Sequence, residues 1–371
     1  MNAGKFIADH IHGIGSSGIR RVFDLGASLT DPINFSIGQP DFPVPEPIKE
    51  AMIKAIKEDR NGYTVTRGIP QLRERLAHDL KQEFDWEPDV FAISGLSGGL
   101  LLGLHAMINP GDEVIVMDPY FVSYPHLVRL VGGKPVFVDL YDDFQLDVEA
   151  IRAAITPRTK LILCCSPSNP TGTVYREHDL EQVCALAREH DLLIVSDEIY
   201  GLLTYDKENP SPARYAPERT LLLRGFGKSY AMTGLRMGYA AGPEEIITAM
   251  AKIQQYTFVC APQPAQWGAL AALDVDMTPQ INEYRRKRDL LADRLKEAYE
   301  FVHPGGGFYL FARTPKRYEN ATAFVEEGIR RNMLTIPGEV FSARDTHFRI
   351  SYAVSDATIE RGCELLLEMA G

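Results

Sequence analysis

The chain has 371 residues, with 39 basic and 50 acidic side chains and a formal net charge of −11. This acidic balance disfavours a protein that tracks nucleic-acid phosphates, because such a protein needs a net basic face. The apolar fraction of 45% and the charged fraction of 24% are ordinary for a globular protein and exclude a disordered one. The length suggests about two or three domains of roughly 150 residues, which need no disulfide or metal staple.

Cysteine spacing and hydropathy indicate where the protein works. The five cysteines include no Cys-x-x-Cys pair, which is typical of a reduced, cytoplasmic chain without a metal site. Residues 1–10 mix charged and apolar side chains and have no apolar core, so no signal peptide is visible. Residues 90–111 carry no charge and are long enough to span a bilayer, but their five glycines favour a strand, a turn and a buried helix. We therefore expect neither a membrane nor a nucleic acid as partner.

Short apolar runs alternate with helical patterns through the middle of the chain. Strands are predicted at residues 90–94, 113–117, 134–138, 160–165, 192–195, 221–224 and 237–241, with helices at 100–108, 124–130, 148–155 and 177–190 between them. Strands that are apolar throughout and separated by helices predict an α/β fold with a mostly parallel sheet, covered on both faces in three αβα layers. Ligand sites in such sheets lie beyond the carboxyl ends of the strands.

The last quarter of the chain has a different pattern of predicted helices and strands. A charged helix is predicted from about Thr278 to Tyr299, followed by strands at 305–311 and 348–352 and helices at 321–331 and 356–369. This pattern predicts a smaller α+β domain, with which the segment before Pro45 packs. We expect a large domain at residues 45–281, a small domain formed by residues 1–44 and 282–371, and a hinge at the charged helix.

Polar residues follow four of the predicted strands. Gly95-Leu96-Ser97 opens a helix, where free backbone amides can cradle a phosphate, although a tight turn would also explain the glycine. Asn169 lies between Pro167 and Pro170, which fix its side chain or simply form an Asx-Pro turn. Each of these signals is weak alone.

The next two strand ends carry charge. Asp197 follows a buried strand, with Tyr200 close behind, and either binds a cation or caps a helix. Lys228 follows glycines, which allow close approach, although a lone lysine is usually a solvated charge. Arg236 lies in an apolar stretch, where a guanidinium usually holds an anion. A phosphate cradle, an amide, a carboxylate, a phenol, a lysine and an arginine together suit pyridoxal phosphate.

The order of the motifs points to a family. They are Phe35-Ser-Ile-Gly-Gln-Pro-Asp-Phe42, Tyr63-Thr-Val-Thr-Arg-Gly-Ile-Pro70, Asp118-Pro-Tyr-Phe121, Ser168-Asn-Pro-Thr-Gly172, Ser196-Asp-Glu-Ile-Tyr200, Gly227-Lys228 with Arg236, Pro337-Gly-Glu-Val-Phe341 and Phe348-Arg-Ile-Ser-Tyr-Ala353. In this order and over nearly the whole chain, the sequence resembles the class I/II, aspartate-aminotransferase-like family of fold-type I pyridoxal phosphate enzymes.

The resemblance implies roles at the reacting end of the cofactor. Lys228 matches the lysine that joins the cofactor's aldehyde and then moves the proton of the substrate's α-carbon. Asp197 matches the carboxylate that pairs with the pyridine nitrogen. Asn169 and Tyr200 match the donors to the phenolic oxygen, which lower the proton affinity of the lysine–cofactor linkage.

The resemblance also implies how the cofactor is held. Phe121 matches the aromatic residue that stacks on the ring. Gly95, Leu96 and Ser97 match the phosphate-binding turn, and Arg236 matches the phosphate's arginine. Tyr63 matches a tyrosine that the partner subunit lends to the phosphate, which implies a homodimer with shared sites.

Substrate contacts are implied in the same way. Arg349 matches the arginine that clamps the α-carboxylate, Asn169 lies beside it, and Gly38 matches the loop that closes over it. Arg67 takes the place at which some relatives use a partner-subunit lysine for the substrate's distal carboxylate. It is alternatively a solvated loop residue or an interface ion pair. On this basis we expect aspartate or glutamate as one substrate.

One position departs from the family pattern. Gly225 stands where the family commonly has a serine that donates to the phosphate, so we expect weaker cofactor retention. The expected function is a ping-pong aminotransferase acting on an amino acid and a 2-oxo acid. A β-lyase acting on sulfur amino acids is the alternative enzyme, since one fold hosts several chemistries. A cofactor-sensing transcriptional regulator is disfavoured, because the Phe35 motif begins too early to leave room for a DNA-binding module.

Overall fold

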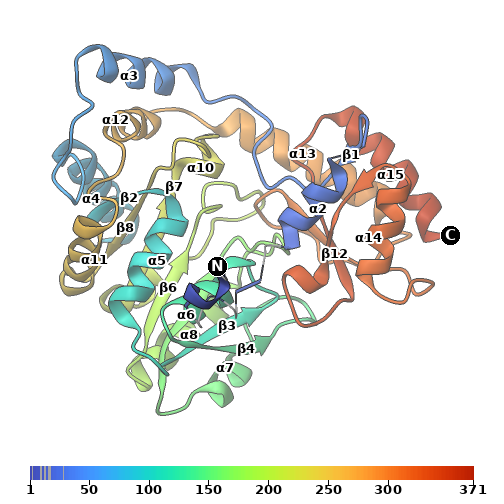
Figure 1. Cartoon of the computed structure of the whole chain (residues 1–371), viewed down its shortest axis with the longest axis horizontal. Coiled ribbons are helices and arrows are strands. Elements are labelled where there is room, and N and C mark those ends of the chain that lie inside the picture. Colours follow the sequence, from blue (N-terminus) through green and yellow to red (C-terminus); the bar gives the residue numbers. More distant parts are fainter. Residues whose placement is uncertain (2, 9–10, 12–13, 16–17, 28) are drawn as a thin grey trace.

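The computed structural model describes residues 1, 3–8, 11, 14–15, 18–27 and 29–371. A seven-stranded sheet lies at the centre of its larger part (Figure 1). Its strands are β2 (Asp89–Ile93), β3 (Glu113–Asp118), β4 (Lys134–Asp139), β5 (Thr159–Cys165), β6 (Leu193–Asp197), β7 (Thr220–Gly225) and β8 (Gly238–Gly242). They are arranged in the order β2-β8-β7-β6-β5-β3-β4. Strand β8 is antiparallel to β2 and β7, and the other pairs are parallel. The expected mostly parallel α/β sheet is confirmed.

Helices cover both faces of this sheet (Figure 1). The helices of this part of the chain are α3 (Glu46–Lys57), which packs on α12, and α4 (Pro70–Phe84), α5 (Gly95–Met107), α6 (Ser123–Leu130), α7 (Val148–Ala154), α8 (Glu177–Glu189), α9 (Pro212–Tyr215), η2 (Pro217–Arg219), α10 (Phe226–Ser229), α11 (Glu244–Tyr256) and α12 (Gln263–Ala272). Successive strand side chains point to opposite faces, so Phe91 packs in the cluster with α5, α6 and α11 while Val90 packs in the one with α4 and α12. Both faces are therefore buried, which explains the continuous apolar runs.

A second region follows the large sheet. It contains α13 (Thr278–Leu295), β9 (Tyr309–Arg313), α14 (Ala321–Arg330), β10 (Met333–Leu334), β11 (Ile336–Pro337), η3 (Gly338–Val340), β12 (His347–Ser351) and α15 (Asp356–Ala370). Strands β11, β12 and β9 form an antiparallel sheet in that order. The α/β body with an additional α+β region therefore matches the expected architecture.

The N-terminal residues join this second region. Strand β1 (Ile33–Asn34) pairs in parallel with β10, and Val22 of α2 (Gly18–Gly26) packs against Phe144 and Phe311. The first described helical segment, η1 (Ala3–Phe6), precedes them. The domain limits at residues 45 and 281 stay a prediction, although this strand pairing supports them.

Two predicted boundaries were wrong. Helix α13 ends at Leu295 instead of residue 299, because the Tyr299 ring turns into the core and its hydroxyl donates to the Leu366 carbonyl at 2.6 Å. The strand expected from residue 305 begins only at Tyr309, because Gly307 has a left-handed φ of 69° that ends the preceding turn. This shift places Tyr309 at the beginning of its strand.

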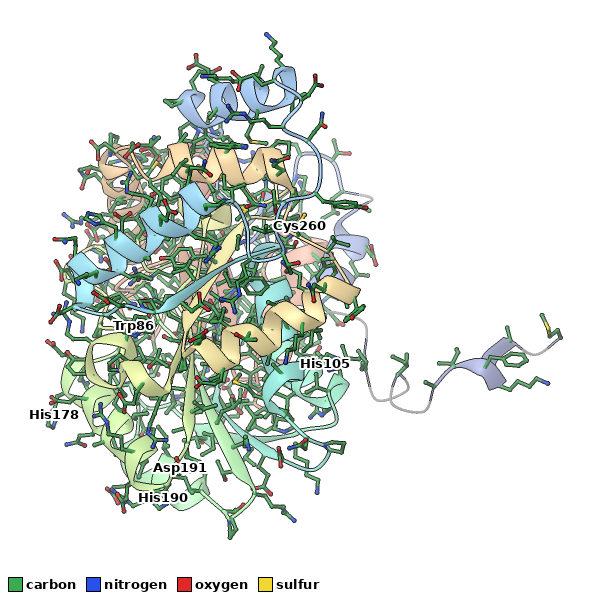
Figure 2. The ribbon with its side chains drawn as sticks, turned by 90° about the vertical axis from the view of Figure 1, so that its left-hand side faces the viewer. Trp86, His105, His178, His190, Asp191 and Cys260 are labelled. Atoms are coloured by element: carbon green, nitrogen blue, oxygen red, sulfur yellow. The ribbon has the colours of Figure 1, made fainter. Side chains whose placement is uncertain are left out.

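Within the described part of the chain, no helix has both the length and the apolar character needed to cross a bilayer. The same residues contain no group of three His, Cys, Asp or Glu side chains that could hold a metal ion. His105 on α5, His178 on α8 and Cys260 after α11 lie apart from one another in Figure 2.

Candidate active site

A cavity of about 330 Å³ lies at the carboxyl ends of β2, β5, β6 and β7. Residues 38, 309 and 349 of the second region contribute to its lining. Every predicted site residue lines this cavity except Tyr63 and Arg67. The strand ends therefore bring together side chains that are far apart in the sequence.

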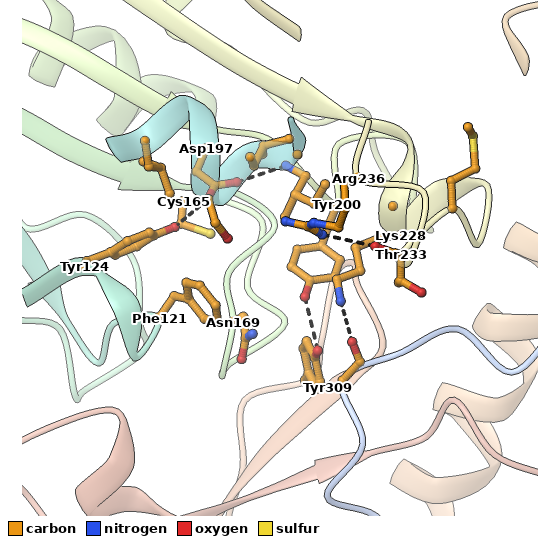
Figure 3. A pocket seen from close by; sticks show the side chains of 18 of the residues that line it. Phe121, Tyr124, Cys165, Asn169, Asp197, Tyr200, Lys228, Thr233, Arg236 and Tyr309 are labelled. Atoms are coloured by element: carbon orange, nitrogen blue, oxygen red, sulfur yellow. Dashed lines mark hydrogen bonds between the residues drawn. The ribbon is translucent and has the colours of Figure 1, made fainter. Parts of the chain in front are cut away.

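Asp197 is a buried carboxylate at the end of β6. The Tyr124 hydroxyl donates to its Oδ2 at 2.8 Å, and the Ile199 amide donates to its Oδ1 at 3.1 Å (Figure 3). Both partners are neutral, so burial raises the pKa of Asp197 to about 6. A turn follows the strand at this point, which removes the interpretation of Asp197 as a helix cap. The group is suited to pair with a cation in the cavity.

The next residue, Glu198, has a different task. Consecutive residues of an extended chain point in opposite directions, so Glu198 faces away from the cavity. It accepts from the Arg224 guanidinium at 2.9 Å, and Arg224 also pairs with Glu83 of α4 at 2.7 Å. This chain of charges fixes the end of β6 against β7 and α4, and with it the position of Asp197.

Lys228 lies on α10, directly after β7. Its Nζ donates to the Gly38 carbonyl (Figure 3). Burial, together with the guanidinium groups of Arg349 and Arg236, lowers the pKa of Lys228 to about 8. The amine therefore loses its proton more easily than a surface lysine, as a nucleophile requires.

The N-terminus of α5 and Arg236 form a cradle. A Cβ at Gly95 would lie 2.5 Å from Nη2 of Arg236, so the guanidinium packs directly against the glycine, whose φ is 72°. Ser97 lies in the first turn of α5, where backbone amides are free to bind an anion. Arg236 differs from its sequence interpretation because it is exposed at the cavity and not enclosed by apolar residues. Its φ is 53°, and its Nη1 donates to the Thr233 carbonyl at 3.1 Å.

Gly225 has a packing reason to be glycine. Its φ of −160° is open to any residue, but a Cβ there would lie 2.4 Å from Cδ1 of Leu96. Gly238, its partner across β7 and β8, would place a Cβ 3.0 Å from the same atom. Leu96 packs between two paired glycines, so a side chain at position 225 would have to displace the end of the Leu96 side chain.

Arg349 on β12 forms the other end of the cavity. Only 1% of the residue is exposed, and its Nη1 and Nη2 donate to Asn169 Oδ1 and to the Ser36 carbonyl, each at 2.9 Å. The guanidinium carbon lies 4.4 Å from the ring centre of Tyr309 and 4.9 Å from that of Phe341. Its buried Nε has no partner among the described residues, and burial lowers the pKa of Arg349 from its usual range. A fixed planar fork with a free N–H is suited to a carboxylate.

Tyr63 and Arg67 lie outside this cavity. Tyr63 is 83% exposed on the loop before α4. Arg67 is held within its own chain, by an ion pair with Asp89 and by a hydrogen bond to Thr248 Oγ1 at 2.7 Å. Their predicted roles require a second subunit and stay predictions.

The sequence interpretation missed Tyr124 and Tyr309, which line the cavity beside Asp197 and Tyr200. Tyr124 lies three residues after Phe121, and Tyr309 follows three consecutive glycines and a phenylalanine. A hydroxyl in an apolar run was the available signal for Tyr309, whereas Tyr124 lies between Ser123 and Pro125 and had no such signal. Cys165 was also missed as a lining residue; burial raises the pKa of its thiol, which makes the thiol unreactive.

Comparisons with known proteins agree with this geometry. The profile of the family described as aminotransferase class I and II matches residues 30–366. The putative aminotransferase YugH of Bacillus subtilis is 39% identical, over 98% of this chain and 97% of that protein. The probable aspartate aminotransferase of Methanocaldococcus jannaschii is 37% identical, over 98% and 99% of the two chains. The structure of Thermus thermophilus aspartate aminotransferase with maleate superimposes with a TM-score of 0.92 at 36% identity, covering 98% of this chain and 99% of that one.

The sheet with a lysine, a carboxylate and a phosphate cradle at its strand ends defines a fold-type I enzyme. The chain belongs to the class I and II aminotransferases. The family resemblance and the enzyme class expected from the sequence are thereby confirmed.

Proposed function

We propose that this enzyme uses pyridoxal 5′-phosphate to move an amino group from aspartate or glutamate to a 2-oxo acid in a ping-pong cycle. The observation that carries the proposal is the convergence in one cavity of an amine with a lowered pKa, a buried carboxylate and two separate guanidinium groups. Each of these groups matches one part of the cofactor or of an amino-acid substrate.

The donor set fits this cofactor. The cradle of Gly95, Ser97 and Arg236 supplies amides, a hydroxyl and a guanidinium for a phosphate. Asp197 supplies an anion for a ring nitrogen, and Phe121 supplies an aromatic face. When bound, pyridoxal phosphate offers an aldehyde to amines and a ring that accepts electrons from the substrate's α-carbon.

The residues of the chain do the remaining work. Lys228, in its neutral form, would hold the cofactor through its aldehyde carbon and, once displaced by the substrate's amine, would move a proton between the substrate's α-carbon and that former aldehyde carbon. Asp197 would pair as a carboxylate with the ring nitrogen and stabilise the charge that develops on the ring. The Tyr124 hydroxyl and the Ile199 amide keep this carboxylate in place.

The orientation of Asn169 supports its role as a donor. Because Asn169 Oδ1 accepts from Arg349, its NH₂ group is left to donate into the cavity. Arg349 thereby serves two purposes: it orients the amide that serves the phenolic oxygen, and its remaining N–H groups bind the substrate's α-carboxylate. The Ser36 carbonyl accepts from Arg349, and Gly38, two residues further on, lines the cavity together with Arg349.

Relatives support a dicarboxylic substrate. Two of the similar proteins are aspartate aminotransferases by name, and the structure of one of them holds maleate, a dicarboxylate. Arg67 would have to leave Asp89 and Thr248 to reach a partner's substrate, so the proposal rests on the relatives rather than on this residue.

We also propose a homodimer. Exposed apolar side chains gather where the loop before α4 meets the end of α11, and they include Tyr63, Val65, Tyr256 and Phe258. Gln254 ties the two segments together through a bond to the Thr66 carbonyl at 2.9 Å. Exposed apolar side chains on two joined segments favour burial against a second copy, and in the proposed dimer Tyr63 would reach the other subunit's phosphate.

A reducing compartment suits the cysteines. All five are free, and four are buried. We therefore propose that the enzyme works in the cytoplasm, where thiols stay reduced.

Two experiments test the proposal. Borohydride reduction of the loaded enzyme followed by peptide mapping should place the pyridoxyl group on Lys228; an adduct on another lysine contradicts the assignment. A panel of amino acids with 2-oxoglutarate should give the highest kcat/KM with aspartate. Turnover that needs no 2-oxo acid would instead indicate a lyase.

The shared site has its own test. Lys228→Ala and Tyr63→Phe homodimers should each be impaired, and mixing the two chains after reversible dissociation should restore activity by forming one intact site per mixed dimer. A single-chain mass in light scattering, or no recovery on mixing, contradicts the shared site.

A further inference from the structure

Tyr309 joins the two ends of the cavity although it belongs to neither the cofactor cradle nor the carboxylate clamp. It begins β9, is 1% exposed and lines the cavity. Its ring lies under the Arg349 guanidinium, 4.4 Å from the guanidinium carbon. Its hydroxyl points the other way along the cavity, toward Tyr200 (Figure 3).

The two tyrosine hydroxyls form one hydrogen bond. Tyr200 Oη and Tyr309 Oη are 3.1 Å apart, and Tyr200 is 3% exposed. The rings meet edge to face, with centroids 5.7 Å apart and planes at 82°. Packing of the rings therefore fixes the distance between the hydroxyls, and burial raises the pKa of both, so both remain protonated.

Two glycines pack closely against Tyr309, one at its hydroxyl and one at its carbonyl. A Cβ at Gly38 would lie 2.7 Å from Tyr309 Oη, so position 38 is glycine because this hydroxyl lies against it. A Cβ at Gly172 would lie 2.5 Å from the Tyr309 carbonyl oxygen. Tyr309 is thus enclosed by the segment that closes the cavity and by the loop that carries Asn169.

Proton counting decides the direction of the bond. Each hydroxyl has one proton to donate. If Tyr200 spent its proton on Tyr309, it would have none for the phenolic oxygen of the cofactor. If Tyr309 donates instead, the Tyr200 proton is free for the cavity, and the bond polarises the Tyr200 hydroxyl so that it donates more strongly.

We propose that Tyr309 is a positioning residue that donates its hydroxyl proton to Tyr200 and thereby directs and strengthens the hydrogen bond from Tyr200 to the cofactor's phenolic oxygen. This inference rests on the proposed function. It assigns separate tasks to two parts of one side chain: the hydroxyl tunes the cofactor through Tyr200, and the ring supports Arg349 from below.

The hydroxyl is tested by a pH titration of the visible absorbance of the loaded, resting enzyme. Donors to the phenolic oxygen lower the proton affinity of the Lys228 linkage, so a weaker donor raises the midpoint. Tyr309→Phe should raise it by about 0.1–0.6 pH unit, corresponding to a 10–30% weaker charge-assisted bond. Tyr200→Phe removes the bond and should raise it by about 1–2 pH units.

The double variant separates a relay from a general disturbance. If Tyr309 acts through Tyr200, Tyr200→Phe/Tyr309→Phe titrates with the midpoint of Tyr200→Phe alone. Shifts that add, or an unchanged midpoint in Tyr309→Phe, overturn the inference. Unbound pyridoxal phosphate also absorbs, so gel filtration removes it before the titration, and a moderate loss of stability then does not obscure the result. A wild-type enzyme that retains no cofactor absorbance after loading with pyridoxal phosphate and gel filtration would instead contradict the proposed function.

The ring is tested by a KM-against-kcat split. Tyr309→Phe keeps the ring and should leave KM for aspartate within about twofold, whereas Tyr309→Leu removes the surface under Arg349 and should raise KM about five- to thirtyfold, as expected for loss of a desolvated cation–π contact. Tyr352→Phe is the matched control: it removes a buried hydroxyl that bonds to the Gly307 carbonyl at 3.2 Å and does not line the cavity. The control should leave the absorbance midpoint unchanged, and a shift equal to that of Tyr309→Phe would overturn the relay.

Discussion

The two ends of the cavity are held by different means. At the cofactor end, Asn169, Asp197 and Lys228 lie at or just beyond the ends of three strands that main-chain hydrogen bonds join in a single sheet. At the carboxylate end, Arg349 lies on β12 and bonds to Asn169 and Ser36, which are 180 and 313 positions away in the sequence. One end is fixed by the regularity of a sheet and the other by a few side chains that bridge distant segments.

This difference separates two properties of the enzyme. Changes at the sheet end should act on cofactor retention and on kcat, because the proposed function places these groups against the cofactor. Changes at the bridging end should act on KM for the amino acid, because the proposed function places Arg349 and the Gly38 segment against the substrate. A variant that changes cofactor retention and KM for the amino acid equally would show that the two ends of the cavity are coupled.

The largest effect is expected from Arg349→Ala. Loss of a desolvated, bidentate partner for the α-carboxylate should lower kcat/KM by about 1000-fold for every amino acid, mostly through KM. The cofactor dissociation constant should change far less, because Arg349 acts on the cofactor only through the orientation of Asn169. Steady-state kinetics and fluorescence titration with pyridoxal phosphate measure the two quantities. An equal loss of cofactor affinity would break the separation of the two ends.

Arg67→Ala is the comparison variant. If Arg67 reaches the distal carboxylate from the partner subunit, KM rises for aspartate and glutamate and stays level for alanine. An equal effect on all substrates would reduce Arg67 to an ion pair with Asp89 that holds the loop before α4.

Asp197→Asn should have the next largest effect. The variant should fold, because the Asn oxygen can still accept from the Ile199 amide, and the Tyr124 hydroxyl can rotate its proton away and accept from the new NH₂ group. Turnover should fall by at least about 100-fold through loss of the charge beside the ring nitrogen, with KM nearly unchanged. Near-normal turnover would mean that the carboxylate only closes the turn after β6.

Local geometry explains how much of the site could be predicted from the sequence. Asn169, Asp197 and Lys228 could be found because the end of an apolar strand is a local signal and parallel strands end on the same edge. Glu198 and Asp197 are equally acidic neighbours, and strand alternation makes only Asp197 face the cavity.

Features that depend on distant contacts could not be predicted. The aromatic rings around Arg349 come from β9 and from the turn after η3, and the bond between Tyr200 and Tyr309 joins residues 109 positions apart in the sequence. The exposure of Arg236 depends on a left-handed turn that no glycine marks. The pairing of Arg67 with Asp89 could not be predicted either, because the motif that contains Arg67 gives its place in the sequence and not its partner.

The pH dependence of cofactor capture depends on residues at both ends of the cavity. Burial, Arg349 and Arg236 lower the pKa of Lys228 to about 8, so its reactive neutral form increases with pH. Capture of pyridoxal phosphate by the apoenzyme, trapped with borohydride, should accelerate about tenfold per pH unit below about 8 and level off above it. Arg349→Gln and Arg236→Gln each remove a positive neighbour and should move the midpoint upward, the former further. A midpoint unmoved by either change would confine the cause to burial.

The smallest effect concerns Gly225, where the sequence predicts weak retention because a phosphate-binding serine is lost. The structure gives this loss a steric origin: a Cβ at position 225 would lie 2.4 Å from Leu96 Cδ1. Gly225→Ser alone should therefore not restore retention. It should displace Leu96 at the start of α5, disturb the cradle and raise the cofactor dissociation constant about three- to tenfold. Gly225→Ser combined with Leu96→Ala makes room for the hydroxyl and should lower that constant below the value of either single variant, by about fivefold relative to Leu96→Ala, as one added hydrogen bond predicts. Equilibrium titration with the cofactor, and thermal unfolding of the apoenzymes as a check on packing, measure the cycle. If Gly225→Ser tightened cofactor binding by itself, Leu96 would have moved aside for the new side chain without disturbing the cradle. The sheet end would then tolerate a local change, and its regular packing would not be what fixes the cofactor at this position.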